Sequence, residues 1–182
     1  MVFHPAPKPH FTPWDSVEHD ACALYMSVRK HGQSTFGTLK RALGALISMG
    51  HRTGFVNGEG DGAGVQTDIP RRLWARRLAQ AGLPSYLATR PGFWVGHLFV
   101  PPEMSETLLR DALSAHFDHA GLNPLYLEPG RVRPEALGAQ ARQKPPQFWQ
   151  IAGHVSNTEN LEERLLHVQA ALERDFPCHF AS

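Results

Sequence analysis

The sequence predicts one domain in which helices alternate with β-strands. Its 182 residues, of which 42% are hydrophobic, are enough for a domain with its own hydrophobic core. Apolar residues recur at helical spacing in several segments, among them 36–47, 103–120 and 161–172. Apolar runs bounded by proline and glycine, of which residues 93–100 are the clearest, predict strands instead.

The chain begins with a leader that differs from the rest. Residues 1–21 are rich in proline and lack apolar periodicity, so they predict an extended, loosely attached leader or propeptide. In residues 21–28, the apolar side chains of Cys22, Leu24, Met26 and Val28 occupy every second position. That period of two predicts a strand that starts at Cys22.

A helix and a glycine-dense loop follow this strand. The helix is predicted with Ser34 or Thr35 as its cap and Gly50 as its stop. The glycines of residues 50–64 permit backbone conformations that side chains forbid, so the segment is a functional loop or a hinge. A phosphate loop is one alternative, but no Lys-Ser or Lys-Thr follows. A calcium loop is another, but Glu59 and Asp61 are too few carboxylates.

The later elements are predicted from the same two periodicities. Two of them have a clear beginning or end, because Pro70 starts a helix with Leu73, Trp74 and Leu78 inward, and Gly121 stops the helix of residues 103–120. The arginines of the Pro70 helix are predicted to form a solvated face. In chain order, the strands are predicted at 63–67, 93–100, 125–127, 148–155 and within 176–182, with a helical turn at 134–142 and a last helix over 161–172.

Charge and composition exclude several classes of function. The net charge is +1 without long blocks of like charge, so neither a nucleic-acid nor an anionic-membrane footprint is present. No apolar run reaches the length of a membrane span, and no secretory signal is recognisable. We expect a cytoplasmic protein in which the two cysteines, Cys22 and Cys178, are free thiols.

Cys22 would acquire special chemistry if the chain were cut in front of it. An N-terminal cysteine carries a thiol nucleophile and an α-amine base in one residue. The unperturbed pKa of an α-amine, about 7.7 to 8.0, suits proton transfer near neutral pH. One proteolytic cut would therefore create a covalent catalyst.

Several motifs carry a resemblance to a known family. They are Asp20-Ala21-Cys22, Met49-Gly50-His51-Arg52, the loop of residues 60–70, residues 95–101, residues 145–147 and residues 161–165. In order and spacing, this set resembles the N-terminal glutaminase region of glutamate synthase, a class II glutamine amidotransferase with an N-terminal nucleophile. The resemblance covers nearly the whole chain after the leader.

The resemblance implies an α+β fold, the Ntn-hydrolase-type αββα sandwich of antiparallel sheets, truncated here at its C-terminus. Residues 22–182 would be the N-terminal part of the amidotransferase domain. Glutamine would be hydrolysed to glutamate and ammonia through a thioester on Cys22, with Arg52 gripping the substrate carboxylate and Gly60, Asp61 and Gly62 supporting the site. No metal site is implied.

The sequence also departs from the family pattern. Thr53-Gly54 stands where the family has Gly-Ala, and Asn57-Gly58 is in the wrong place to be the family's oxyanion-hole pair. In the family those donors, which each contribute several kcal/mol, come from a segment after the last residue of this chain. We therefore expect either that the chain is truncated or that a partner chain supplies the rest of the domain, and that this chain alone is a poor catalyst or none.

No cofactor is expected in this chain, and FMN and an iron–sulfur cluster are expected on a synthase domain or subunit. Two alternatives stay open from the sequence. One is a non-catalytic binding or regulatory module with an uncleaved leader, and the other is an Ntn hydrolase that acts on another amide.

Overall fold

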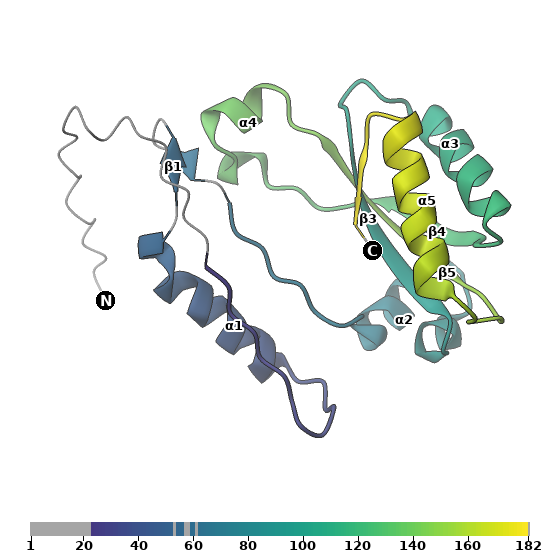
Figure 1. The fold of residues 1–182 in the computed structure, drawn as a ribbon, viewed down its shortest axis with the longest axis horizontal. Helices are drawn as coiled ribbons and strands as arrows, with labels where there is room; N and C mark the ends of the chain where they lie inside the picture. Colours follow the sequence, from purple (N-terminus) through teal and green to yellow (C-terminus); the bar gives the residue numbers. More distant parts are fainter. Residues whose placement is uncertain (1–22, 53, 57–58, 61, 182) are drawn as a thin grey trace. The chain divides into compact units, whose positions relative to one another are not determined.

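The computed structural model describes residues 23–52, 54–56, 59–60 and 62–181 (Figure 1). The chain divides into two compact units, residues 1–66 and residues 67–182. Each unit is built from its own local elements.

The first unit contains one long helix and a small two-stranded ribbon. Helix α1 (Phe36–Ser48) leads into the short 3₁₀ helix η2 (Gly50–Arg52), and strands β1 (Phe55–Val56) and β2 (Glu59–Gly60) pair in antiparallel fashion. The helix is where its periodicity predicts it. Thr35 occupies the N-cap position, but its side chain makes no cap bond and its Oγ1 instead accepts a 2.8 Å hydrogen bond from Arg29.

Two strands predicted at 21–28 and 63–67 are wrong for the residues that the structure describes. Residues 23–28 and 63–67 contain no strand, and the alternating side chains of Leu24, Met26 and Val28 are 90%, 80% and 79% exposed. The alternating pattern only places the apolar side chains on one face of an extended segment. Formation also requires a neighbouring strand to satisfy the backbone groups, and none of the described residues pairs with these segments.

The second unit is organised around a four-stranded antiparallel sheet in the order β4-β5-β3-β6. Strand β3 (Phe93–Val100) is internal, as its strongly apolar sequence predicts. It pairs along its full length with β5 (Gln147–His154) and over three residues with the short β6 (His179–Ala181). Strand β4 (Pro124–Pro129) completes the sheet beside β5.

Helices cover both faces of this sheet. Helices α3 (Glu106–His119) and α5 (Leu161–Asp175) lie side by side on one face (Figure 1), and α2 (Arg71–Gln80) with η3 (Ser85–Thr89) covers part of the other. The remaining helical turns are η4 (Pro134–Ala136) and α4 (Ala139–Gln143), where the sequence predicts one helical turn. Helices packed on an antiparallel sheet confirm the α+β class.

The larger core lies between the sheet and the pair α3 and α5. Alternate residues of β3 point into it, including the fully buried Leu98, and Phe117 and Leu172 reach it from the two helices. The smaller core lies under α2, where Trp74 and Leu78 pack on Phe93. In each strand, residues of opposite parity therefore serve opposite faces.

The helix boundaries follow from local chemistry. Ser105 caps α3 by accepting a hydrogen bond from the Leu108 amide at 3.3 Å, and Gly121 ends the helix with a φ of +63°. The periodicity overestimates the buried faces slightly, because Leu73 and Leu108 are 40% and 50% exposed. None of the helices among the described residues has the length and apolar character that a membrane crossing requires.

Candidate active site

Arg52 lies at the end of the helical part of the first unit. Its amide donates to the Met49 carbonyl at 2.8 Å, which closes the η2 turn directly after α1. His51 is held in the same turn, because its Nδ1 lies 3.1 Å from the Ser48 carbonyl. Basic side chains are favourable at the negative end of a helix dipole. The Arg52 side chain is exposed, so its guanidinium is available for a two-pronged contact with a carboxylate.

The glycine loop begins within a tight antiparallel ribbon. Phe55 pairs with Gly60 and Val56 with Glu59, which places Gly60 at the end of β2 and close along the chain to the η2 turn. Gly62 follows with a φ of +99°, a value that L-residues rarely adopt, and no atom lies within 4 Å of where its Cβ would be. The need for glycine there is conformational rather than steric.

Three of the sequence-predicted site residues are described by the structure, and two are not. Arg52, Gly60 and Gly62 fall within the same compact unit. Cys22 and Asp61 lie outside the described residues, as does Thr53, where the sequence departs from the family pattern. The roles assigned to all five residues therefore stay predictions.

The second cysteine has an environment unsuited to nucleophilic attack. Cys178 is a free, half-buried thiol between α5 and β6. Burial, and then the negative charge of Glu173, raise the pKa of this thiol above its usual value. Because the thiolate is the reactive species, Cys178 stays protonated and inert near neutral pH.

Cys178 also lines a shallow hollow in the second unit. The volume of this hollow is about 390 Å³, and its walls are mostly proline and aromatic side chains with Lys144 and Glu173 as the charged members. Lys144 is already paired with Glu103 at 3.1 Å, and a Glu173 oxygen accepts from the Phe180 amide at 2.9 Å. Both charged side chains that line the hollow are therefore engaged in contacts within the protein.

A series of hydrogen-bonded polar side chains links α2 to strands β5 and β3, and it was not predicted from the sequence. Arg77 of α2 donates to the Gln150 side-chain oxygen, and the Gln150 amide nitrogen lies 3.2 Å from Nε2 of His97. Burial, and then the charge of Arg77, lower the pKa of His97. An uncharged imidazole can accept at Nε2 from an amide N–H, so the contact and the pKa agree on a neutral His97.

The hydrogen-bonded series from Arg77 to His97 corrects the interpretation of the α2 arginines as only a solvated face. Arg77 also lies over the Trp74 ring, 5.2 Å from its centroid. Arg71 donates to the carbonyls of Ala88 and Arg90 at 2.9 and 3.0 Å, which ties η3 to the helix. Arg72 and Arg76 are exposed, as predicted. No local signal identifies which arginine makes a distant contact.

The described residues contain no group of three or more histidine, cysteine, aspartate or glutamate side chains that could hold a metal ion. Some of the described charged groups form ion pairs, such as His179 with Glu173 and Arg110 with Glu106.

Comparison with known proteins identifies relatives for most of the chain. A family model described as glutamine amidotransferases class-II matches residues 22–178. Ferredoxin-dependent glutamate synthase 2 of Synechocystis sp. is 34% identical over 145 residues, which is 76% of this chain and 9% of the relative. The chloroplastic ferredoxin-dependent glutamate synthase 2 of Arabidopsis thaliana is 28% identical over 158 residues, 83% of this chain and 10% of the relative.

A third relative is the glutamate synthase [NADPH] large chain of Bacillus subtilis, 27% identical over 108 residues, which is 58% of this chain and 7% of the relative. The chain thus spans about a tenth or less of the length of the curated relatives it matches.

Proposed function

The chain belongs to the class II glutamine amidotransferases, and we propose that it acts as the glutamine-hydrolysing region of a glutamate synthase-like protein. The observation that carries this proposal is the family match, which begins at Cys22, the residue that the sequence marks as a nucleophile. The relatives support the synthase assignment, since they are glutamate synthases.

The proposed reaction starts once Cys22 is the first residue of the chain. Its thiol attacks the side-chain amide carbon of glutamine, and the thiol proton passes through the α-amine to the departing nitrogen. Ammonia leaves and a glutamyl thioester remains on Cys22. Water then adds to the thioester, glutamate departs, and the sulfur regains its proton. The α-amine serves both steps because its ordinary pKa lies near neutrality.

The described residues have supporting roles in this proposal. Arg52 is exposed on the η2 turn and would bind the α-carboxylate of glutamine through its guanidinium fork. The positive φ of Gly62 gives the loop a backbone that other residues adopt with difficulty. Together with Asp61, which lies outside the described residues, Gly60 and Gly62 would support the site, with Asp61 organising the loop rather than reacting.

The ammonia would be used by a synthase region or subunit. FMN and an iron–sulfur cluster are proposed to reside there, because such clusters are held by several cysteine thiolates. This sequence has two cysteines, one proposed as the nucleophile and the other half-buried. The residues present therefore do not fit a cluster, and no step of the hydrolysis is assigned to one.

Labelling with a glutamine-analogue electrophile tests the proposal. The chain is produced with its N-terminus at Cys22 and with its leader intact, and each form is treated with the label and analysed by mass spectrometry. We expect labelling of Cys22 only in the cut form, with protection by excess glutamine. Cys22→Ala should abolish labelling, and Cys178→Ala, the matched control, should leave it unchanged.

Glutamine hydrolysis is measured on the same samples, alone and with a synthase partner added. Labelling that follows Cys178, or full hydrolysis by the Cys22→Ala variant, would refute the nucleophile assignment. A cut form that neither reacts with the label nor hydrolyses glutamine with the partner present would favour a binding module instead.

The role of Arg52 has its own test. Arg52→Gln removes the charge and Arg52→Lys keeps it without the fork. We expect KM for glutamine to rise about tenfold or more in Arg52→Gln, in line with the loss of a charged hydrogen bond. The exposed Arg72 offers a matched control, and Arg72→Gln should leave KM unchanged. An unchanged KM in Arg52→Gln would exclude the carboxylate contact.

A further inference from the structure

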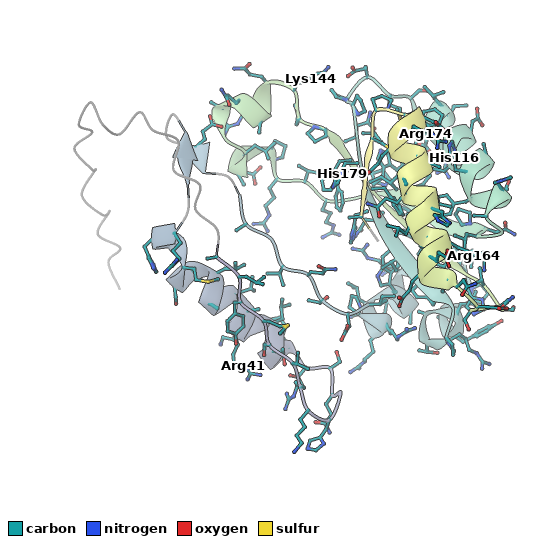
Figure 2. All side chains as sticks on the ribbon, viewed as in Figure 1. Arg41, His116, Lys144, Arg164, Arg174 and His179 are labelled. Carbon is teal, nitrogen blue, oxygen red and sulfur yellow. The ribbon has the colours of Figure 1, made fainter. Side chains whose placement is uncertain are left out.

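His116 joins two helices through both nitrogens of its ring. It lies in the last turn of α3, and its side chain is 15% exposed. Nδ1 is 2.9 Å from the carbonyl oxygen of Ala112, and Nε2 is 2.9 Å from Oδ2 of Asp175, the last residue of α5. Figure 2 shows His116 and Arg174 at the same end of α5.

Both partners of the ring are hydrogen-bond acceptors. A carbonyl oxygen and a carboxylate cannot donate, whereas a neutral imidazole carries only one N–H. Only the doubly protonated ring can therefore make both contacts at once. If the ring loses a proton, the lone pair of one ring nitrogen points at the lone pair of an acceptor oxygen. That hydrogen bond is then lost.

The surroundings of the ring are consistent with a positive charge. On its own helix, it lies near the negative end of the α3 dipole, with the exposed His119 one turn further on. On α5 it meets Asp175, which is also bound by Arg174 at 2.8 and 3.1 Å. The segment after α5 presents the uncharged ring of Phe176, edge-on with centroids 5.6 Å apart.

The Asp175 carboxylate is ionised near neutral pH. Hydrogen bonds from Arg174, and then from His116, lower the pKa of Asp175 to about 2. Any change in the contact near neutral pH must therefore come from the imidazole.

The end of α5 that His116 holds also fixes strand β6. Glu173, two residues before Asp175, accepts from the Phe180 amide at 2.9 Å and contacts His179 Nδ1 at 3.0 Å. Phe180 is fully buried in the larger core, while β6 itself pairs with β3 over only three residues. A short edge strand of this kind depends on its side-chain anchors.

We propose that His116 is a protonation-dependent clamp, which in its charged form fixes the C-terminal turn of α5 against α3 and thereby holds β6 in the sheet. Deprotonation would release one ring contact, loosen the turn that carries Glu173, and raise the rate at which β6 opens. None of its residues is among those proposed to carry the glutaminase chemistry.

The test combines two measurements on the full chain. The first is the protonation state of the ring, read from the two imidazole nitrogens by NMR at about pH 7, where an unperturbed histidine is mostly neutral. We expect His116 to carry protons on both nitrogens and the exposed His119 to be mostly neutral. A singly protonated His116 would overturn the proposal.

The second is amide hydrogen exchange in residues 178–181, expressed as protection relative to the unfolded chain at about pH 5.5 and about pH 9. His179→Gln is used as the background, because the His179 ring is a second ionisable group that contacts Glu173, at 3.0 Å. Burial and then the charge of Glu173 raise the pKa of the Cys178 thiol, which moves its ionisation to higher pH. We expect protection to fall about tenfold at the higher pH, the size of one charged hydrogen bond reduced by partial exposure.

Matched variants decide the origin of that change. His116→Gln should abolish the pH dependence, and so should Asp175→Asn, which gives a second measure if the first variant folds poorly. His119→Gln should behave as the background. A fall in protection that persists in both His116→Gln and Asp175→Asn, or no fall in the background, would refute the clamp.

Discussion

The close approach of β6 to β3 makes a sharp prediction about Gly96. This glycine points into the larger core, and a Cβ placed on it would lie 2.5 and 2.6 Å from two atoms of the Phe180 ring. It would also lie 3.0 Å from Cγ2 of Ile151 on the neighbouring strand. Carbon atoms prefer separations of about 3.5 to 4.0 Å, so the Phe180 ring would have to move by about 1 Å.

The surroundings decide how costly that movement is. Phe180 and Ile151 are both fully buried, so neither side offers free space, and overpacked cores cost about 1 to 3 kcal/mol. We expect Gly96→Ala to lie at the upper end, about 3 kcal/mol less stable. The measurement is equilibrium unfolding in urea followed by tryptophan fluorescence, since Trp94 and Trp149 lie in the same core.

A second substitution separates the steric cause from others. Phe180→Leu shortens the side chain that the new Cβ would meet, so the double variant Gly96→Ala with Phe180→Leu should be more stable than the sum of the single effects, by about 1 kcal/mol. Gly44→Ala is a control without a clash, because its Cβ meets nothing within 4 Å, and since Gly44 lies in α1 this exchange should stabilise by up to about 1 kcal/mol. An unchanged urea midpoint in Gly96→Ala, or strictly additive single effects, would refute the steric argument.

Three further predictions concern the helix ends. Ser105→Ala removes the N-cap of α3 and should cost about 1 kcal/mol in urea unfolding, whereas Ser105→Asp should be nearly neutral. Arg164→Met should cost about 1 to 2 kcal/mol, because this guanidinium donates to the Ala120 and Gly121 carbonyls at 2.7 Å and so satisfies the end of α3. Arg72→Met, at an exposed position, should change stability by less than about 0.5 kcal/mol. Asp175 has a pKa lowered from 3.8 to about 2, first by Arg174 and then by His116. Its stabilisation is therefore present above about pH 4 and lost as the pH falls towards 2, so thermal unfolding of Asp175→Asn should depend less on acid than the wild type. An identical acid dependence would contradict this.

The elements predicted correctly are those whose pattern is completed by nearby burial. Strand β3 occupies residues 93–100 as predicted, and the inward face of α5 contains the expected Leu165, Val168 and Leu172. In both cases, the periodic apolar side chains are those that the folded protein buries. The short strands predicted at 21–28 and 63–67 failed over their described residues, because a strand needs a hydrogen-bonded neighbour that periodicity cannot supply.

Capping residues show a similar limit. Thr35 is at the predicted start of α1, yet its hydroxyl contacts the side chains of Arg29 and Thr38 and caps no backbone amide of the helix. Helix α5 begins after Asn160 instead of after the predicted cap, Asn157 or Thr158. Asn160 itself has a left-handed backbone conformation, with a φ of 51°. Several small polar residues in a row each satisfy the preference for a cap, so residue type alone cannot choose among them.

For the candidate site, the sequence supplies motifs and the structure supplies environments. Arg52 and the glycine loop could be identified only because their order and spacing resemble a family. The chain from Arg77 through Gln150 to His97 could not be identified at all, since its members are 73 and 53 residues apart in sequence. Such contacts depend on the strand order of the sheet, which no local pattern specifies.

The two cysteines illustrate why environment, rather than residue type, assigns the nucleophile. Cys178 is half-buried beside the Glu173 carboxylate, and both burial and that charge raise the pKa of its thiol. A thiol held in this state presents little thiolate for attack. The proposed role of Cys22 avoids the problem, because a base on the same residue removes the thiol proton as the reaction proceeds. The chemistry therefore requires an α-amine beside the thiol, and of the two cysteines only Cys22, where the family match begins, can gain one from a single cut that keeps the rest of the matched region.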